Sequence, residues 1–568
     1  MAQRPTAAGA ARGITGRSAF LGVLAQEGVR VLFGNPGTTE LPIMDSLAEH
    51  PEIRYVLGLE EGTVLTMAEG YARATGRLTA VNVHVAPGLG NAMGSLYGAK
   101  RSGAPIIVTA GQQEQGLALT EPVLHDALVP MAAPLVKWAI EITRVQDLPR
   151  ILHRAAKVAM TPPTGPVFIS LPGDVLNARA EMELGAPTRV DSAVRPAEAG
   201  LARLAERLLE ADAPVILAGH ESSTTGALEA LGRVASLLGA PVYSQTVSHS
   251  AVFPSRHALF MGELTRDQRR MRAVLEKADL LFAAGTDVFT VSVPSPVDPL
   301  PPGLPIVQIG LKDWELGKNY PAELAIRADL RETLAALIPL LEARRKPAQA
   351  KATEARARAL EDKNWSAHRR RREAELEKLA QAKPIEPEYL MACVARALPA
   401  NGVVVDDGVT SARPLHQHLE IADPKRYFGL CGGGIGWGLP GAVGVKLGLP
   451  DRPLICVSGD GSAMYNVQSL WSAAHEKLPI AYVICNNGSY RILKERLFAY
   501  GGEAVAREAF IGMDLDNPAI DFVGLARSLG VAARRVTEPA ELPEALEEAL
   551  AAGGPMLLDV HVARGFKP

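Results

Sequence analysis

Residues 453–490 read PLICVSGDGSAMYNVQSLWSAAHEKLPIAYVICNNGSY. Two short apolar runs, LICVS and IAYVIC, have the composition of buried strands, and the helix-like segment SLWSAAHEK separates them. A strand, a helix and a second strand in this order form a right-handed crossover, which places the two strands side by side and parallel. The stretch therefore predicts an α/β unit in which Asp460 and Asn487 follow the ends of adjacent strands.

Short apolar, β-branched runs that end in Gly, Pro, Asp or Asn recur along the whole chain, and helical patterns separate them. This alternation is typical of parallel sheets covered by helices on both faces. We therefore predict an α/β fold of three doubly wound parallel-sheet domains, with ligands bound at the carboxyl ends of the strands. The runs are VRVLFGNPG, TAVNVHVAPG, PIIVTAG, PVFISLPGD, APVILAG, DLLFAAG, PIVQIG, VVVDDG, PLICVSGDG, AYVICNNG and MLLDVHV.

Domain boundaries follow from length and composition, because 568 residues exceed what a single hydrophobic core can organise. The segment after PVFISLPGDV has little strand or helix signal and ends the first domain. A later, highly charged segment contains an Arg369–Arg372 run, whose flanking glutamates favour a solvated helix face over a nucleic-acid site. We predict domains at 12–185, 195–343 and 380–568, with a charged helical linker at 344–379.

The overall charge excludes some classes of partner. A net charge of -3 and a pI near 6.5 leave no broad basic surface, so we expect small-molecule substrates and neither nucleic acid nor a membrane as partner. No signal-peptide pattern and no apolar run of about 18 residues occurs, so we expect a cytoplasmic protein. The four cysteines are far apart and form no CxxC pair, which predicts reduced, buried thiols: Cys393, Cys431, Cys456 and Cys485.

The GDG segment has the features of a phosphate and metal site. Its glycines let backbone N–H groups approach an anion, and the following helix presents its positive end. A carboxylate at such a site requires a cation between itself and the phosphate, and Mg²⁺ prefers oxygen ligands of this kind. Asp460 and Asn487 could then share one metal ion. Each motif taken alone is more often a simple turn.

Together the two motifs resemble the GDG...NN motif of thiamine diphosphate-dependent enzymes. In that family the aspartate, the second asparagine and a backbone carbonyl two residues later hold Mg²⁺, which implies Asp460, Asn487 and Ser489 here. The resemblance spans almost the whole chain and is closest to the benzoylformate decarboxylase group. The matching segments are GNPGTTELP (34–42), LEEGTVLTMAEGYARATG (59–76), NVHVAPGLGNAMG (82–94), PIIVTAGQQ (105–113), FPSRHALFMG (253–262) and GGGIGWGLPGAVGVKL (432–447).

The resemblance assigns cofactor-binding roles. Glu61 in LEEG matches the carboxylate at a strand end that activates the aminopyrimidine of the cofactor, and strand alternation is expected to point Glu60 the opposite way, as an exposed structural acid. Ile435 matches the bulky apolar residue beneath the bent cofactor. Further cofactor-binding positions implied by the family are Thr410, Gly434, Gly461, Ser462 and Tyr490.

The resemblance also implies a substrate pocket. His84 in NVHVAPG matches the histidine that meets the reacting carbonyl, although a lone histidine at a strand end is often structural. Thr38 lies where the decarboxylases have a serine that holds the substrate carboxylate, and it retains the hydroxyl group.

Three positions depart from the benzoylformate decarboxylase pattern. Ser292 aligns with the second active-site histidine, and a serine cannot act as a base near neutral pH. Ile492 and Arg496 lie four residues apart on one helix face, where the decarboxylases have a small residue and an aromatic one. Arg496 could hold a second anionic group of the substrate or point outward. Candidates for a displaced histidine, each with a structural alternative, are His125, His416 and His418.

These similarities imply a thiamine diphosphate- and Mg²⁺-dependent enzyme that decarboxylates a 2-keto acid to an aldehyde and CO₂. The alternative is a carboligase or lyase of the acetolactate synthase or benzaldehyde lyase kind, acting on hydroxyketones or an aldehyde. A non-catalytic paralogue is a third alternative, against which the presence of Glu61, Asp460 and Asn487 argues. The middle domain has no clear FAD signature, so FAD is not expected. The family forms active sites between chains, which implies a homodimer or homotetramer.

Overall fold

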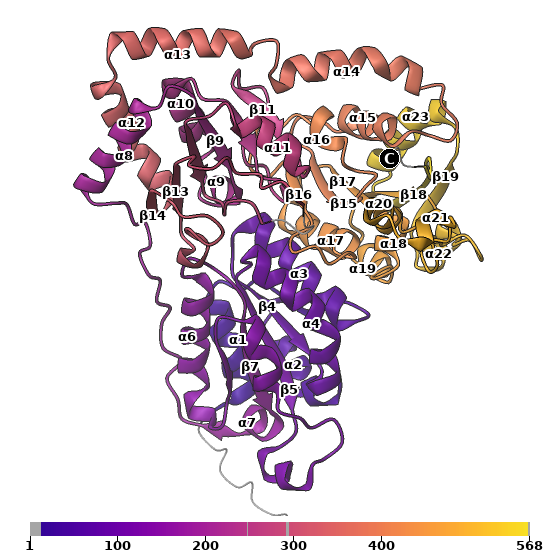
Figure 1. Ribbon diagram of the computed structural model, residues 1–568. Helices are drawn as coiled ribbons and strands as arrows, with labels where there is room; N and C mark the ends of the chain where they lie inside the picture. The colour runs from indigo at the N-terminus through magenta and orange to yellow at the C-terminus, as the bar shows by residue number, and fades with distance from the viewer. Residues whose placement is uncertain (1–12, 247, 291–294, 566–568) are drawn as a thin grey trace, which may run out of the picture. The chain divides into compact units, whose positions relative to one another are not determined.

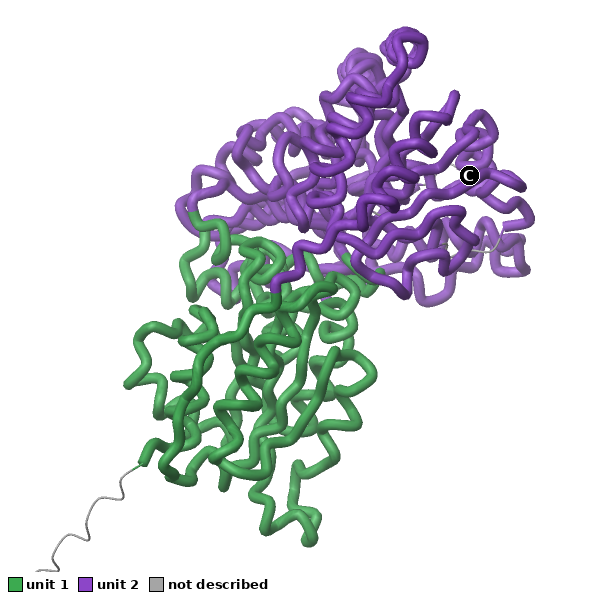
Figure 2. The backbone as a smooth tube through the Cα atoms, turned by 90° about the vertical axis from the view of Figure 1, so that its left-hand side faces the viewer, with its two compact units in different colours: residues 1–190, 431–450, 466–478 green, residues 191–430, 451–465, 479–568 purple. Residues whose placement is uncertain are grey.

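The computed structural model describes residues 13–246, 248–290 and 295–565. Figure 1 shows its helices and strands, and Figure 2 shows the two compact units into which the chain divides. Unit 1 comprises residues 1–190, 431–450 and 466–478, and unit 2 comprises residues 191–430, 451–465 and 479–568.

Unit 1 contains a six-stranded parallel sheet with the order β3-β2-β4-β5-β7-β6. Its central strands are completely buried, and helices α1 and α6 pack together beside it. A short antiparallel pair, β1 (Ile14–Thr15) with β8 (Arg179–Ala180), is separate from this sheet. The strands are β2 (Val31–Gly34), β3 (Arg54–Leu57), β4 (Thr79–Val83), β5 (Ile106–Gln112), β6 (Ala139–Glu141) and β7 (Val167–Pro172), and the main helices are α1 (Gly16–Gln26), α3 (Glu61–Thr75), α4 (Val85–Ser102) and α6 (Leu148–Met160).

Helix α6 illustrates why the sequence forms these layers. Its buried residues Leu148, Leu152, Ala155 and Ala159 recur every three or four positions, so they make one apolar face. These side chains belong to the same core as the strand residues Val167 and Ile169 and much of α1. Burial of this face holds α6 against the sheet.

Helix α3 is held by backbone-to-backbone packing against α17 (Gly438–Gly448), also in unit 1. A Cβ atom at Gly444 would overlap the carbonyl of Met67, and one at Gly70 would overlap the carbonyl of Gly441. Only glycine permits this approach. The contact fixes the helix whose first residue is Glu61.

Unit 2 contains two six-stranded parallel sheets, with the orders β11-β10-β9-β12-β13-β14 and β16-β15-β17-β18-β20-β19. Each sheet packs with its helices around a separate apolar core. The first sheet has β9 (Pro214–Ala218), β10 (Val242–Ser244), β11 (Phe260–Glu263), β12 (Leu280–Ala284), β13 (Ile306–Gly310) and β14 (Leu324–Arg327), and the second has β15 (Val403–Asp407), β16 (Tyr427–Gly429), β17 (Leu454–Gly459), β18 (Ala481–Asn486), β19 (Ala532–Val536) and β20 (Met556–His561).

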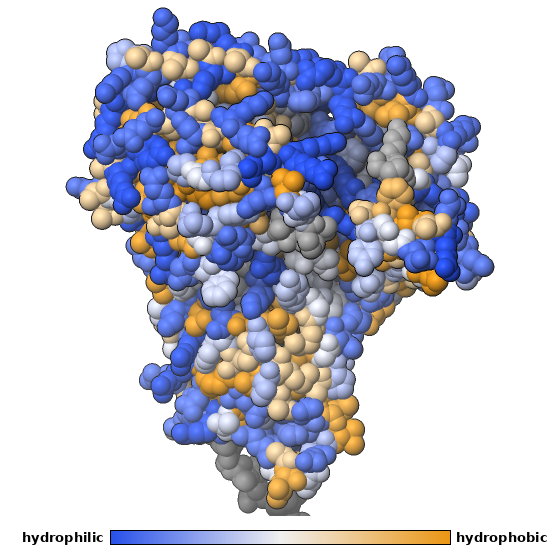
Figure 3. Space-filling view, viewed as in Figure 1, coloured by the Kyte–Doolittle hydropathy of each residue, from blue (hydrophilic) through white to orange (hydrophobic). Residues whose placement is uncertain are grey.

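The charged segment between the two sheets of unit 2 forms helices α13 (Pro347–Leu360) and α14 (Trp365–Leu379). Figure 3 shows mostly hydrophilic residues over these helices. Arg369 and Arg372 of the basic run form ion pairs with Glu373 and Glu388. The run therefore belongs to a charged helix in which two of the four arginines pair with carboxylates.

The predicted fold class is confirmed, since three parallel sheets flanked by helices are present. All four cysteines are buried free thiols, as predicted. Across the described residues, every helix is too short or too polar to cross a membrane.

Candidate active site

The carboxyl ends of β17 and β18 bring the two motifs of residues 453–490 together. These strands pair in parallel, with Gly459 opposite Cys485. Asp460 therefore follows the end of one strand and Asn487 the end of its neighbour, which confirms the predicted crossover. Both side chains lie in unit 2.

Asp460 is 3% exposed and accepts several backbone hydrogen bonds. Its Oδ1 atom accepts from the N–H of Gly461 at 2.8 Å. Its Oδ2 atom accepts from the N–H groups of Asn487 at 3.1 Å and Ser489 at 3.3 Å. Gly488 has a φ of 60°, the left-handed conformation that lets this turn direct both amides at one carboxylate. The turn thus fixes the distance between Asp460 and the NNGS segment.

The side-chain oxygen of Asn487 is the feature that best fits a bound cation. Asn487 is 5% exposed, and its Oδ1 atom has no hydrogen-bond partner among the described residues. A buried acceptor without a partner is costly unless a ligand satisfies it. Mg²⁺ takes carboxylate, amide and backbone carbonyl oxygens, which is the donor set of Asp460, Asn487 and Ser489.

The electrostatics of Asp460 also favour a bound cation. Burial raises the pKa of Asp460, against the lowering effect of its backbone hydrogen bonds. A bound cation would favour the ionised carboxylate and relieve this cost. No cluster of three or more His, Cys, Asp or Glu side chains suited to a metal occurs among the described residues, so the candidate site would combine the Asp460 carboxylate with amide and carbonyl oxygens.

The second glycine of GDG has a packing role that its sequence pattern does not indicate. A Cβ atom at Gly461 would overlap the ring of Tyr490, so the tyrosine lies directly against the glycine. Ser462 is buried in the short helix α18 (Asp460–Ala463). Thr410 is buried just beyond β15, after Val409, which has an unusual φ of 48° for a β-branched residue. These residues lie in unit 2 with Asp460.

Gly434 and Ile435 lie in a glycine-rich loop of unit 1. Gly434 is exposed and Ile435 is half-buried. The loop is anchored where Asn466 Nδ2 donates to the carbonyl of Gly436 at 2.8 Å, and Asn466 Oδ1 accepts from Thr63 Oγ1 at 2.8 Å. This chain of hydrogen bonds links the loop to the first turn of α3, near Glu61.

Glu61 lies in a helix and not at a strand end, which corrects the prediction. It is the first residue of α3, four residues beyond the last residue of β3. Its Oε2 atom accepts from Asn91 Nδ2 at 3.0 Å, and its Oε1 atom lies beside Gly88. The carboxylate is half-buried, so it can meet a ligand.

Glu60 does not point away by strand alternation, because it too lies outside β3. It is the N-cap of α3 and accepts from the N–H groups of Gly62 at 2.8 Å and Thr63 at 2.7 Å. It is half-buried and has the structural role of satisfying free helix donors.

His84 has a buried carboxylate partner, Glu40, which sequence reasoning missed. The Nδ1 atom of His84 lies 2.7 Å from Glu40 Oε2, and Glu40 has no exposed surface. Glu40 also accepts from the N–H of Gly37 at 2.9 Å and that of Gly111 at 2.9 Å. Because strands β2 and β4 are neighbours, a carboxylate after one and a histidine after the other could have been paired from the sequence.

The imidazole of His84 lies directly against the backbone of Gly37, where a Cβ atom would overlap the ring. With Nδ1 directed at Glu40, the Nε2 atom remains for a ligand, and the side chain is 22% exposed. Val85, the next residue, has a φ of 42°, which is strained for a β-branched residue and often marks a functional position.

Thr38 is exposed in the 3₁₀ turn η1 (Thr38–Glu40). Its neighbour Thr39 contacts both members of the His84–Glu40 pair. Thr39 Oγ1 donates to Glu40 Oε1 at 2.7 Å and lies 3.1 Å from His84 Nδ1. Thr38 thus keeps its hydroxyl available for a ligand.

The remaining predicted pocket residues are dispersed. Ser292 lies outside the described residues. Ile492 is half-buried and Arg496 is exposed, both on helix α20 (Arg491–Tyr500) of unit 2. His125 lies in a loop of unit 1.

The other two candidate histidines have structural contacts. His416 packs against Tyr427, with ring centroids 4.6 Å apart. His418 is buried and lies 3.5 Å from Glu388. The contact with Glu388 gives His418 a structural explanation.

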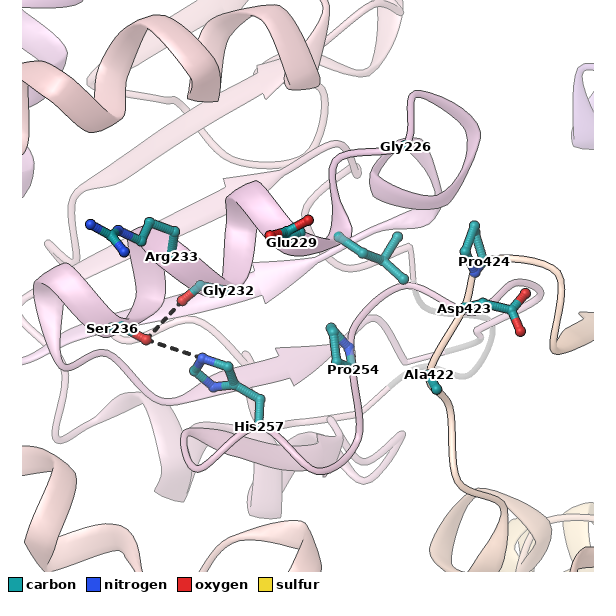
Figure 4. A pocket seen from close by; sticks show the side chains of 11 residues that line it. Gly226, Glu229, Gly232, Arg233, Ser236, Pro254, His257, Ala422, Asp423 and Pro424 are labelled. Atoms are coloured by element: carbon teal, nitrogen blue, oxygen red, sulfur yellow. Dashed lines mark hydrogen bonds between the residues drawn. The ribbon is translucent and has the colours of Figure 1, made fainter. Parts of the chain in front are cut away.

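A separate cavity of about 650 Å³ lies in unit 2 between helix α10 (Leu228–Leu238) and the loop at residues 422–424 (Figure 4). Several of its polar groups are already engaged. His257 contacts Ser236 at 3.1 Å, Asp423 pairs with Arg452, and Arg233 pairs with Glu342. None of the predicted site residues lines this cavity.

Comparison with known proteins agrees with these motifs. Three thiamine pyrophosphate enzyme models match the chain: the N-terminal TPP binding domain at residues 14–128, the central domain at 201–337 and the C-terminal TPP binding domain at 407–560. Benzoylformate decarboxylase of Pseudomonas aeruginosa is 35% identical over 549 residues, which cover 96% of this chain and 98% of that protein.

Two further relatives extend the comparison. Acetolactate synthase isozyme 1 large subunit of Escherichia coli is 26% identical over 96% of this chain and 94% of that protein. The solved structure of thiamine diphosphate-dependent 4-hydroxybenzoylformate decarboxylase from Rhodococcus jostii RHA1 has a TM-score of 0.84 and 30% identity, covering 98% of this chain and all of that one. Because these matches extend over all three sheets, the chain belongs to the family of thiamine pyrophosphate enzymes.

Proposed function

We propose that this protein is a thiamine diphosphate- and Mg²⁺-dependent decarboxylase that converts a 2-keto acid to an aldehyde and CO₂. The observation that carries the reaction type is the His84–Glu40 pair, because it offers an oriented imidazole for proton transfer at a reacting carbonyl. The identity to benzoylformate decarboxylase over nearly the full chain supports the same reaction.

Bound thiamine diphosphate would supply the carbanion and the electron sink that decarboxylation needs. Asp460, Asn487 and the carbonyl of Ser489 would hold Mg²⁺ against its diphosphate. Glu61 would hold a proton at the aminopyrimidine ring, with its Oε2 atom oriented by Asn91. Ile435, Thr410, Gly434, Gly461, Ser462 and Tyr490 would complete the cofactor site.

His84 and Thr38 would contact the substrate. Glu40 accepts at Nδ1 of His84, so Nε2 of the ring is the atom that would donate or accept a proton at the substrate oxygen. The Thr38 hydroxyl would hydrogen-bond the carboxylate that is lost as CO₂. No side chain is assigned to the role of the second histidine of benzoylformate decarboxylases.

Domain roles and assembly follow from the same proposal. Residues 12–185 would bind the pyrimidine and residues 380–568 the diphosphate and Mg²⁺, with a central domain at 195–343 and the linker at 344–379. We propose a cytoplasmic homodimer or homotetramer with active sites between chains.

A carboligase is the second candidate, supported by the similarity to acetolactate synthase. In that case the activated substrate carbon would attack an aldehyde or a second keto acid. In the decarboxylase it would take up a proton at this step. A lyase that cleaves hydroxyketones would use the same chemistry in reverse.

Cofactor removal and product analysis together test this proposal. Prolonged chelation and dialysis should abolish turnover, and thiamine diphosphate with Mg²⁺ should restore it. A panel of 2-keto acids should then release CO₂ and free aldehyde in equal amounts. CO₂ with hydroxyketone and no free aldehyde would favour the carboligase, and turnover unaffected by cofactor removal would refute both.

A further inference from the structure

The side chain of Asn486 holds the turn that carries the candidate metal ligands. Asn486 is the last residue of β18, and its Oδ1 atom accepts from the N–H of Gly488 at 3.2 Å. An asparagine that bonds its own backbone two residues later stabilises a tight turn of this kind. The same turn directs the amides of Asn487 and Ser489 at Asp460. Asn486 therefore supports the segment that supplies two of the three proposed ligands.

Asp559 determines which end of the Asn486 amide faces that turn. Asn486 Nδ2 donates to Asp559 Oδ1 at 2.9 Å. An ionised carboxylate can only accept hydrogen bonds, so the amide must present its nitrogen to Asp559 and its oxygen to Gly488. With the amide reversed, its nitrogen would face the N–H of Gly488, and two donors would meet without an acceptor. The orientation of Asn486 thus depends on a residue of another strand.

Asp559 lies on the same face of the sheet as Asn486. Strand β20 pairs in parallel with β18, where Asp559 lies opposite Ile484, two residues before Asn486. Residues two apart on a strand point to the same face. The side chain of Asp559 has no exposed surface, and its Oδ2 atom accepts from Arg535 Nε at 3.2 Å and lies 3.4 Å from His561 Nε2. The two oxygen atoms of the carboxylate therefore have separate partners.

The charges around Asp559 favour its ionised form. Burial raises the pKa of Asp559, but its three hydrogen-bonding neighbours together lower the pKa below its usual value. Arg535 is itself held in place, because its Nη2 atom donates to Asp521 Oδ1 at 3.1 Å. A buried carboxylate that stays ionised is a fixed acceptor, so Asn486 keeps one orientation near neutral pH.

We propose that Asp559 is a positioning residue for the Mg²⁺ site, because it holds Asn486, and through Asn486 the turn at Gly488, in one conformation. The inference rests on the proposed function and assigns a further residue to its metal site. Mg²⁺ requires nearly octahedral oxygen ligands at about 2.0–2.1 Å, whereas the larger Ca²⁺ accepts flexible and irregular sets. A rigid turn should therefore select Mg²⁺ over Ca²⁺, and a loosened turn should lose that selection.

Asp559→Asn tests this role by replacing the fixed acceptor with an amide of similar volume. Arg535 donates to the other oxygen of Asp559, so it attracts the new amide oxygen and leaves the new nitrogen against Asn486. The full chain, stripped by chelation and dialysis, is titrated calorimetrically with Mg²⁺ or Ca²⁺ at saturating thiamine diphosphate. The Kd for Mg²⁺ should rise about 10- to 100-fold, and the Kd for Ca²⁺ by less than about threefold.

Glu27→Gln is the matched control, because Glu27 is also a buried carboxylate paired with one arginine and one histidine. Its side chain has no exposed surface and contacts Arg189 and His153, both in unit 1. Urea unfolding should show lower stability for both variants, whereas only Asp559→Asn should change the preference for Mg²⁺ over Ca²⁺. An unchanged preference in Asp559→Asn, or an equal change in Glu27→Gln, would overturn the inference.

A second variant keeps the test decisive if Asp559→Asn does not fold. Asp559→Glu retains the charge that pairs with Arg535 but places the carboxylate one methylene group farther from the backbone. It should therefore displace Asn486 and also reduce the preference for Mg²⁺. Here too, an unchanged preference would refute the positioning role.

The same titrations separate this inference from the proposed function. If the wild type prefers Mg²⁺ more strongly than Asp559→Asn does but decarboxylates no 2-keto acid, the proposed reaction is refuted and the positioning role stands. Decarboxylation by the wild type, with an unchanged ion preference in Asp559→Asn, would keep the proposed function and refute the positioning role. A wild type that binds neither ion with thiamine diphosphate would refute both.

Discussion

The Nδ1 atom of His84 lies 2.7 Å from Oε2 of Glu40, a carboxylate with no exposed surface. A buried acceptor at Nδ1 selects the orientation of the imidazole and leaves Nε2 for other contacts. The backbone of Gly37 closes one face of the ring, so the histidine has little freedom to turn.

Replacing Glu40→Gln should lower kcat while the protein stays folded. The amide keeps the volume of the carboxylate but can no longer stabilise a protonated His84, so we expect a loss of at least about tenfold. Turnover and thermal unfolding should be measured together. Glu52→Gln is the control, because Glu52 pairs with His50 at 3.0 Å in a comparable but exposed contact. If the two substitutions lowered kcat equally, the contact between Glu40 and His84 would have no particular role in turnover.

The adjacent glutamates Glu60 and Glu61 should respond in opposite ways to the same substitution. Glu61→Gln should retain cofactor and lose most turnover, because the amide cannot exchange a proton with the aminopyrimidine. Glu60→Gln should keep turnover and lose about 0.5 to 1 kcal/mol of stability, because it caps α3. Cofactor content, turnover and melting temperature separate the two roles. Normal turnover in Glu61→Gln would remove that residue from the reaction.

The two asparagines of the NN pair should also differ. Asn487→Leu removes a buried acceptor without a partner, so the cofactor-free protein should be as stable as the wild type or more stable, by up to about 1 to 3 kcal/mol, yet fail to bind Mg²⁺ with thiamine diphosphate.

Asn486→Leu is the matched comparison for that change. Asn486 donates to Asp559 at 2.9 Å and accepts from Gly488 at 3.2 Å, so its loss should destabilise the fold by about 1 to 3 kcal/mol. Denaturant unfolding and calorimetric titration measure the two effects. Unchanged Mg²⁺ affinity in Asn487→Leu would contradict its assignment as a ligand.

Glu221 should make stability depend on pH. It is buried after β9, with both carboxylate oxygens 3.0 Å from the backbone nitrogen of Leu311. Burial raises the pKa of Glu221 to about 7, with smaller contributions from Glu315 and Asp329. The folded state then binds more protons than the unfolded state between about pH 4.5 and 7, so stability falls as pH rises through this window.

Glu221→Gln should flatten that dependence, because the amide can still accept from Leu311 and does not titrate. The difference between the variant and the wild type should change by on the order of 3 kcal/mol from pH 4.5 to pH 8. Unfolding by urea across this range measures it, with the exposed Glu229→Gln as control. Parallel pH profiles for the wild type and Glu221→Gln would contradict the raised pKa.

The eleven apolar runs of the sequence all form strands, and the strands missing from that set follow a clear rule. They include the six edge strands of the three large sheets: β3, β6, β11, β14, β16 and β19. Several of these, such as β14 and β19, alternate exposed and buried residues or are only partly buried. An edge strand contacts the core less fully, so its composition need not be continuously apolar. The other omissions are the short strand β10 and the two-residue strands β1 and β8.

The sequence predicted some residues of the candidate site better than others. Asp460 and Asn487 could be paired because one crossover joins them, and such connections have a single favoured hand. Glu61 was identified as a site residue, but its placement at a strand end was wrong, because Glu61 is the first residue of a helix that the side chain of Glu60 caps. Glu40 was missed because it lies in the short 3₁₀ turn η1 after β2, whereas its partner His84 follows another strand.

By itself, the sequence determined the alternation of strand and helix, the parallel sheets and the strand ends that carry Asp460 and Asn487. These properties depend on local periodicity and short connections, which can be recognised in segments of a few tens of residues. Only the tertiary structure decided that Glu40 is buried beside His84 and that the Oδ1 atom of Asn487 has no hydrogen-bond partner among the described residues. Those relationships arise from packing between separate elements, where burial sets the strength of each hydrogen bond and charge.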